Sequence, residues 1–203
     1  MIIKTKYKIA RRLGAPIFEK TQTQKYAQSE QRRGKSKKRT KRGQVTDYGI
    51  QHNEKQKARY TYLMGERQFS NYVKESLAEK GKTTDLLFTK LELRLDNAVS
   101  RIGLATTRSG SRQMVSHGHI RVNGRKVDIP SYRLKIGDKI SIRPGSLPKP
   151  LFANLAERLA EHKSPSWITF DLKKNEGEVQ GLPKMENEEL LFNLGSVIEF
   201  YSR

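Results

Sequence analysis

Between residues 83 and 143 the spacing of apolar residues changes from that of a helix to that of a strand. Up to Gly103 they recur about every four positions, which predicts a helix with one buried face; these residues are Leu87, Leu91, Leu95, Val99 and Ile102. Beyond Gly118, Ile120 and Val122 alternate with polar residues, and Asn123-Gly124 is a typical hairpin turn. With a short helix between Thr106 and Val115, this switch predicts two helices on a small antiparallel sheet.

The flanking segments are more helical. The pattern from Asp47 to Lys80 predicts a helix, and a second helix is expected from about Leu151 to His162. Trp167–Phe170 reads as a strand, whereas Glu176–Glu189 is acidic and reads as a loop. The C-terminal residues 197–201 are apolar enough to need a packing partner. We therefore expect an α+β fold.

The charge is large and unevenly distributed. Lys and Arg number 41 against 21 Asp and Glu, a net charge of +20, of which residues 1–45 carry +13 and residues 91–144 carry +7. Such a field attracts polyanions. Nucleic acid is favoured over an anionic membrane because no basic amphipathic helix stands out, and no apolar run reaches the roughly 20 residues of a membrane span. Composition alone leaves DNA and RNA both open.

Residues 1–45 form a basic N-terminal arm. The run Gln31–Gly43 has nothing to bury, so we expect the arm to be disordered alone and ordered on a phosphate-rich surface. Deletion of the arm is then expected to leave the other domains folded. An organellar targeting peptide is a second interpretation, although Glu19 and Glu30 weaken the acid-poor pattern it requires.

Enzyme motifs fail when their spacing is tested. Gly34-Lys35-Ser36 and Gly81-Lys82-Thr83 both lack the preceding glycine of a nucleotide-binding loop. There is no cysteine, and the four histidines show neither metal-ligand nor catalytic spacing. No catalytic residue, metal or cofactor is therefore predicted.

A cationic surface is expected on the two-helix module. Arg108 and Arg112 are one helical turn apart, near a helix N-terminus whose free N–H groups also favour phosphate. The outward row of the first strand and its hairpin extend this surface, with His119, Arg121, Asn123, Arg125 and Lys126. Folded RNA suits such a surface because duplex RNA is recognised largely by shape, phosphates and 2′-hydroxyls.

Four short motifs follow one another in this part of the chain: R-L-D (94–96), G-L-A-T-T-R (103–108), V-S-H-G (115–118) and V-N-G (122–124). Their order resembles that in the RNA-binding module of the ribosomal protein S-four family. The resemblance covers residues 92–144 in this module. Flanking sequences around Asp47–Gln51 and Glu66–Phe69, Ser166-Trp167 and the ending Glu199–Arg203 extend it to nearly the whole chain. Some relatives hold zinc with cysteines in the arm, and this chain has none.

The resemblance implies a helical domain, residues 46–91 and 175–203, with an inserted α+β domain, residues 92–174, whose RNA-binding core is 92–144. It also implies that the C-terminal segment returns to the helices near residues 48–80. The implied function is structural: early binding to a helical junction in the 5′ domain of small-subunit rRNA, nucleation of assembly, and support of translational accuracy with ribosomal protein S-five. Messenger RNA on its path into the subunit is a further implied partner, and the expected location is the small subunit in the cytoplasm or an organelle.

Carried over by position, the implied RNA contacts in the module are Arg94, Arg101, Thr107, Arg108, Ser111, Arg112, Ser116, His117, Arg121 and Lys126. In the arm they are Arg32, Arg33, Lys37, Lys38, Arg39, Lys41 and Arg42. Two alternatives use the same module. One is an enzyme such as a pseudouridine synthase, for which no separate catalytic domain is visible; the other is a regulatory RNA-binding protein outside the ribosome.

Overall fold

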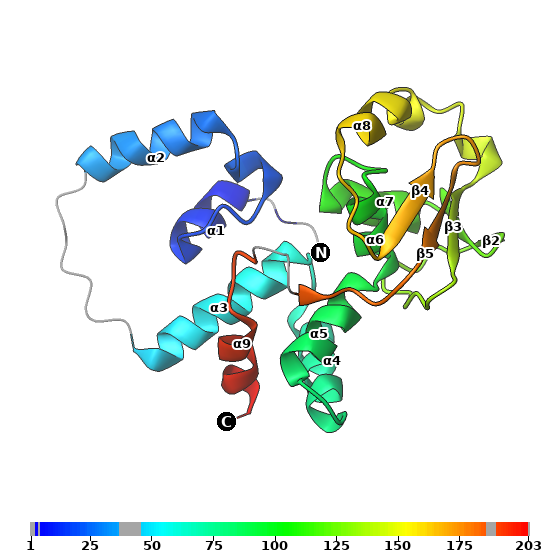
Figure 1. The fold of residues 1–203 in the computed structure, drawn as a ribbon. Helices are drawn as coiled ribbons and strands as arrows, with labels where there is room; N and C mark the ends of the chain where they lie inside the picture. Colours follow the sequence, from blue (N-terminus) through cyan, green and yellow to red (C-terminus); the bar gives the residue numbers. More distant parts are fainter. Residues whose placement is uncertain (1–2, 4, 37–45, 186–189, 203) are drawn as a thin grey trace. The chain divides into compact units, whose positions relative to one another are not determined.

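The computed structural model describes residues 3, 5–36, 46–185 and 190–202, with the backbone alone for 33–36. The chain forms two compact units (Figure 1): one spans residues 1–84 and 187–203, the other 85–186. The N-terminal segment thus falls in the same unit as the helices after it, and residues 175–186 fall in the second unit. Within the described residues no helix is both long and apolar enough to span a membrane.

The first unit is built from helices. They are α1 (Lys6–Leu13), the 3-10 turn η1 (Glu19–Thr21), α2 (Gln24–Ser36), α3 (Asp47–Thr61), α4 (Glu66–Ala78) and the C-terminal α9 (Leu194–Tyr201). Thr46 caps α3, because its Oγ1 accepts a hydrogen bond from the backbone N–H of Gly49 at 3.2 Å. The single helix expected from residue 47 to 80 is interrupted after Tyr62, where Leu63 adopts a left-handed φ of 51°.

The N-terminal segment is folded up to Ser36, so the expectation of a disordered arm is wrong for this part. A small core forms from the buried side chains of Ala10, Leu13, Ile17, Phe18 and Leu63. The Phe18 ring meets Tyr60 edge-on, with centroids 6.3 Å apart. The charged run after Phe18 dominates the sequence of this segment, whereas the residues before it bury apolar surface against the end of α3. Residues 37–45 lie outside the described part.

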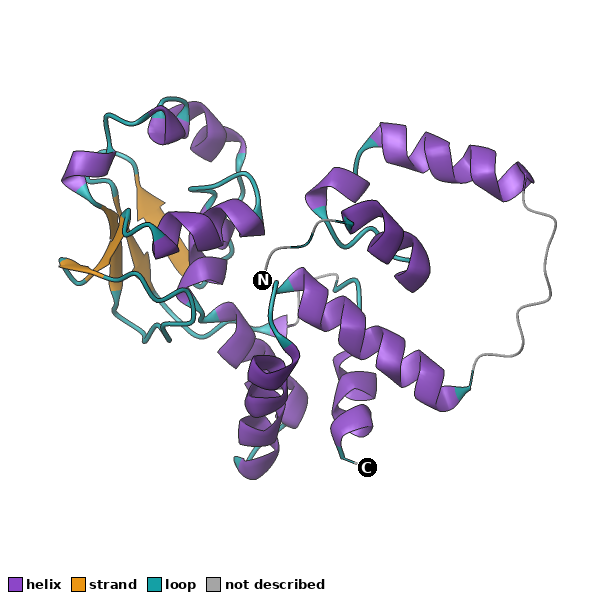
Figure 2. Ribbon diagram, turned by 180° about the vertical axis from the view of Figure 1, so that it is seen from behind, coloured by secondary structure: helices purple, strands orange, loops and turns teal. Residues whose placement is uncertain are grey.

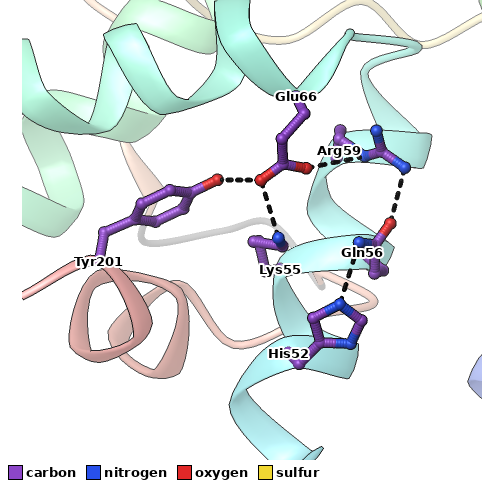
Figure 3. Close-up of polar contacts among 6 residues, drawn as sticks. All are labelled: His52, Lys55, Gln56, Arg59, Glu66 and Tyr201. Atoms are coloured by element: carbon purple, nitrogen blue, oxygen red, sulfur yellow. Dashed lines mark hydrogen bonds and ion pairs between the residues drawn. The ribbon is translucent and has the colours of Figure 1, made fainter. Parts of the chain in front are cut away.

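The C-terminal helix α9 packs on α3 and α4, as expected of this segment. Glu66 of α4 is the centre of the contact (Figure 3): its Oε1 accepts hydrogen bonds from Lys55 Nζ at 2.7 Å and from the Tyr201 hydroxyl at 2.8 Å. The Lys55 ammonium also lies 4.5 Å from the centroid of the Phe200 ring. Burial opposes ionisation of Glu66, but the hydrogen bonds from Lys55 and Tyr201 outweigh it and lower the pKa of this carboxyl.

The second unit packs helices on an antiparallel sheet (Figure 2). Its helices are α5 (Thr83–Glu92), α6 (Leu95–Ile102), α7 (Arg108–Ser116) and α8 (Leu155–Glu161), with 3-10 turns η2 (Pro144–Ser146) and η3 (Pro150–Phe152). Its strands are β1 (Ile120–Val122), β2 (Arg125–Lys126), β3 (Lys139–Ile142), β4 (Ile168–Asp171) and β5 (Glu176–Val179), in the order β2-β1-β3-β5-β4. The α+β fold and the two helices on a small sheet are confirmed.

The core of this unit lies between the helices and one face of the sheet. Its helical side includes Leu95, Val99, Ile102, Met114 and Val115, and its sheet side includes Ile120, Val122, Ile140, Ile142, Ile168 and Val179. The hairpin between β1 and β2 turns at Asn123 and Gly124, whose φ angles of 50° and 77° match a type I′ turn. The apolar periods of the sequence therefore identified the correct buried faces.

Two features of the second unit differ from expectation. The stripe from Leu87 to Ile102 is two helices, because the chain between α5 and α6 is extended and pairs with residues 130–134: Leu134 N–H donates to Leu93 C=O, and Leu95 N–H to Tyr132 C=O, both at 2.9 Å. The segment from Glu176, expected as a loop, begins with strand β5. Gly177 allows this pairing, because a Cβ there would lie 2.7 Å from the Thr169 carbonyl oxygen.

Candidate RNA-binding surface

Arg94 is fully buried in the extended link between α5 and α6. Its guanidinium binds Asp96 in a two-pronged ion pair, with Nε 3.0 Å from Oδ1 and Nη2 2.8 Å from Oδ2. A direct RNA contact by this side chain is therefore excluded in this structure, and the expectation for Arg94 is wrong. The physical reason is tertiary: the backbone of Arg94 pairs with that of Arg133, which turns the side chain inward.

The carboxylate of Asp96 also binds Arg112 of α7, which is partly exposed at the surface. Asp96 Oδ2 also accepts from Arg112 Nη1 at 3.1 Å, and the Arg112 side chain is 28% exposed. The side chains of Arg94, Asp96 and Arg112 together carry a charge of +1. Asp96 therefore stabilises the buried cation and fixes the exposed one.

Arg101 of α6 is held in the same way. Its Nε lies 2.7 Å from Oε2 of Glu92 and its Nη2 lies 3.0 Å from Oε1, while the Glu92 side chain is fully buried. Asn97 also donates to Glu92 Oε2, at 2.7 Å. The partly exposed guanidinium of Arg101 is thus presented in a fixed position, with less side-chain entropy to lose on binding an anion.

Helix α7 begins at a capped N-terminus. Thr107 is the cap, because its Oγ1 accepts from the backbone N–H of Gly110 at 3.0 Å. Ser111 is buried and its hydroxyl donates to the Thr107 carbonyl at 3.2 Å, so a direct RNA contact by the Ser111 side chain is also a wrong expectation. Arg108, the first residue of the helix, is partly exposed beside this N-terminus.

The remaining predicted residues of the module lie at its surface. Ser116 and His117 are exposed at the end of α7, and Arg121 of β1 faces Lys126 of β2 in register. Lys126 also lies 3.3 Å from Asp128, an exposed pair that contributes little energy. Arg121 and Lys126 therefore place two basic residues side by side on the β1–β2 hairpin.

Two cations that sequence reasoning missed lie near His119. Burial of His119, followed by the positive charges of Lys149 and Arg143, lowers the pKa of this imidazole. Arg143 and Lys149 flank the turn η2, whose Ser146 hydroxyl is 2.9 Å from His119 Nδ1. No local sequence pattern indicates that this turn lies beside His119. Only the positive charge of Arg143 and Lys149 could have marked these two residues as candidates.

In the N-terminal segment, Arg32 is exposed on α2. Arg33 belongs to the same helix, and its side chain lies outside the described part. Lys37, Lys38, Arg39, Lys41 and Arg42 also lie outside it. Among the residues that the structure describes, no group of three His, Asp or Glu side chains is arranged to hold a metal ion.

Comparison with known protein families identifies two matching profiles. The S4 domain profile matches residues 93–140, and the profile of the ribosomal protein S4/S9 N-terminal domain matches residues 2–92. Small ribosomal subunit protein uS4 of Roseiflexus castenholzii is 46% identical over 198 residues, 97% of this chain and 96% of the relative. Its counterpart from Chloroflexus aurantiacus is 41% identical over the same shares. The chain belongs to the uS4 family.

Membership of the uS4 family confirms the resemblance drawn from the motifs. The family is one of structural ribosomal proteins, so the enzyme alternative is dropped. The matched S4 domain includes α6, α7, β1, β2 and the start of β3, which carry the cationic surface. Strands β4 and β5, which complete the sheet, lie beyond the match.

Proposed function

We propose that this chain binds the 5′ domain of small-subunit rRNA at a junction of helices and nucleates assembly of the subunit. It acts there as a structural component in the cytoplasmic or organellar ribosome. The uS4 family and the S4 RNA-binding domain support the RNA ligand. The observation that carries the proposal is the pair of surface arginines, Arg101 and Arg112, each anchored on a buried carboxylate.

The anchoring supports phosphate binding on energetic grounds. A guanidinium fixed by a carboxylate loses little side-chain entropy on binding, and its planar fork matches two phosphate oxygens. Glu92 and Asp96 each neutralise one charge, but the module keeps its large basic surplus. The surface is thus both cationic and rigid, which favours a ligand of defined shape over a flexible polyanion.

The proposed contacts divide into two groups. Direct contacts come from Arg101, Arg108, Arg112, Ser116, His117, Arg121 and Lys126 in the module. Arg94, Thr107 and Ser111 instead stabilise the fold of the module. The basic residues of the N-terminal segment, Arg32, Arg33, Lys37, Lys38, Arg39, Lys41 and Arg42, are proposed as additional phosphate contacts.

Nucleotide-resolution footprinting of the full chain on naked small-subunit rRNA tests this function. Protection confined to a 5′-domain junction, with affinity that falls steeply as salt rises, is the expected result. Weak binding without a preferred site would refute it. A regulatory role outside the ribosome predicts instead that most cellular copies sediment apart from small subunits.

We also propose ribosomal protein S-five as a protein partner of the first unit, and mRNA entering the subunit as a second RNA ligand. An acidic hollow of about 290 Å³ supports the protein partner: it is lined by Asp47, Ile50, Gln51, Ser196 and Glu199, between α3 and α9. Gln51 donates to Glu199 at 2.9 Å, but its own Oε1 is buried without a hydrogen-bond partner among the described residues. A basic side chain from a partner protein would pair with the carboxylates of Asp47 and Glu199.

Purified ribosomal protein S-five provides the test. The double substitution Asp47→Asn with Glu199→Gln should weaken its binding, and the loss should shrink at high salt. Glu157→Gln, on the exposed side of α8 in the other unit, is the matched control. Equal affinity of the double variant and the wild type would remove this hollow from the interface.

A further inference from the structure

A pocket opens between α7 and the turn η3, inside the proposed RNA-binding module. Its wall consists of Gly110, Gln113 and Met114 from α7, His117 and His119 just after it, and Leu151 from η3. Gly110, Gln113, Met114 and His117 recur at helical spacing, so they share one face of α7. The pocket is therefore a feature of the helix that also carries Arg108 and Arg112.

The size of the pocket suits one planar ring system. Its volume is about 160 Å³. A cavity of roughly 150 Å³ accommodates a benzene molecule. The opening to solvent leaves room for the remainder of a larger base.

The lining combines flat, apolar and hydrogen-bonding groups. The His117 and His119 rings lie 6.0 Å apart, and His119 is held by Ser146 on one side and by an edge contact with Phe152 at 6.3 Å. Gln113 and His117 are exposed, so their polar atoms are available to a ligand. Because its pKa is lowered, His119 is neutral near pH 7 and offers an uncharged ring face.

The rim of the pocket is cationic. The backbone N–H of Arg143 donates to the His119 carbonyl at 2.8 Å, and Lys149 precedes Leu151 of the wall by two residues. Beyond the effect of burial, both positive charges lower the pKa of the His119 imidazole. A ring-sized recess beside the cations Arg143 and Lys149 matches a nucleotide, with the base in the recess and the phosphate on the rim. An apolar peptide side chain would use the recess but leave the cations unused.

We infer that this pocket binds one unstacked nucleobase of the RNA, an inference that rests on the proposed function. His117 and Leu151 stack on or enclose the base, and Gln113 donates to or accepts from its edge. A protein that reads only phosphates and shape would have no preference for the base at that position. The pocket adds such a preference.

Two substitutions with a matched control test the inference on the full chain and a 5′-domain rRNA fragment. His117→Ala should weaken binding about 5- to 100-fold, the loss typical of one stacked base, and Leu151→Ala should weaken it less. The dependence of affinity on salt should keep the wild-type slope, because no phosphate contact is removed. Leu172→Ala is the control, since Leu172 is 40% exposed, Leu151 is 42% exposed, and Leu172 lies outside the pocket.

Ultraviolet cross-linking with mass spectrometry supplies an independent measurement. We expect a base cross-linked to residues 113–119 in the wild type and in Leu172→Ala, and loss of that cross-link in His117→Ala. Wild-type affinity in both pocket variants, or a loss accompanied by a shallower salt slope, would overturn the inference while leaving the proposed function intact. Failure of the wild type itself to bind the fragment would instead overturn the proposed function.

Discussion

The Oδ2 atom of Asp96 lies 3.1 Å from Nη1 of Arg112, although the two residues are 16 positions apart. The same oxygen is 2.8 Å from Nη2 of Arg94. One buried carboxylate therefore links the interior of the second unit to its proposed RNA-binding surface. Removing this carboxylate should disturb both the fold and the ligand site.

Asp96→Asn is expected to lower the free energy of unfolding by about 3–5 kcal/mol, because it leaves the charge of Arg94 buried without its counter-ion. Denaturant unfolding followed by circular dichroism measures this loss. Asp128→Asn is the control, since it breaks the exposed pair with Lys126 and should cost at most about 1 kcal/mol. Equal stability of the two variants would show that Asp96 is not essential to the fold.

Replacing Arg108 and Arg112 with Ala should weaken RNA binding and flatten its salt dependence. Each lost phosphate contact lowers the slope of log affinity against log salt by ~0.7 to 0.9, so the double variant should lose roughly one to two units. Binding to a 5′-domain rRNA fragment at several salt concentrations gives the slope. Lys173→Ala, at the turn between β4 and β5, should keep the wild-type slope. An unchanged slope in the arginine variant would contradict phosphate contacts at these positions.

Phe18→Ala should destabilise the first unit by about 3–5 kcal/mol, because Phe18 is only 2% exposed and its removal leaves a cavity against Tyr60. Thermal and denaturant unfolding of the full chain measure the effect. Leu77→Ala, at an exposed position of α4, should have a small effect. If Phe18→Ala behaves like Leu77→Ala, the N-terminal helices contribute no packing energy, and deletion of residues 1–45 would be harmless as the sequence suggested.

Acid should weaken the packing of α9 on α3 and α4 within the first unit. The pKa of Glu66 is lowered from its ordinary value of 4.5 in the folded chain, so ionised Glu66 adds stability above that value, and the gain is lost as pH falls through the lower folded pKa. Glu66→Gln should remove this part of the pH dependence. Melting temperatures between about pH 3 and 7 provide the measurement. Glu161→Gln, an exposed change at the end of α8, should leave the acid dependence as in the wild type; parallel curves for Glu66→Gln and wild type would contradict the assignment.

Local sequence patterns predicted the secondary structure correctly where one spacing of apolar residues continued without interruption. The alternation at Ile120 and Val122 and the Asn123-Gly124 turn predicted the hairpin. The break between α5 and α6 was missed because the apolar stripe continues in phase across Leu93 and Arg94. Strand β5 was missed because Glu176 and Glu178 look like loop residues until Gly177 pairs with its neighbours.

For the candidate site, too, the sequence indicated some features and only the tertiary structure decided others. Basic residues and the family motifs indicated an RNA-binding face, but they could not separate arginines that face solvent from those that face a carboxylate. Arg94 and Arg112 look alike in the sequence, and their different roles follow from where Asp96 lies between them in space. Likewise, nothing near His119 in the chain indicates that Lys149 lies beside it.

Charge, period and motif order, all properties of neighbouring residues, were enough to predict the fold class and the uS4 family, and they led to the proposal of an RNA ligand. Which cations are buried, which acids hold them, and which helices the first eighteen residues cover depended on contacts between distant parts of the chain. Such contacts are set by packing and by the cost of leaving a charge unpaired in the interior. Both the packing energy and the cost of an unpaired charge depend on contacts that form only when the chain folds.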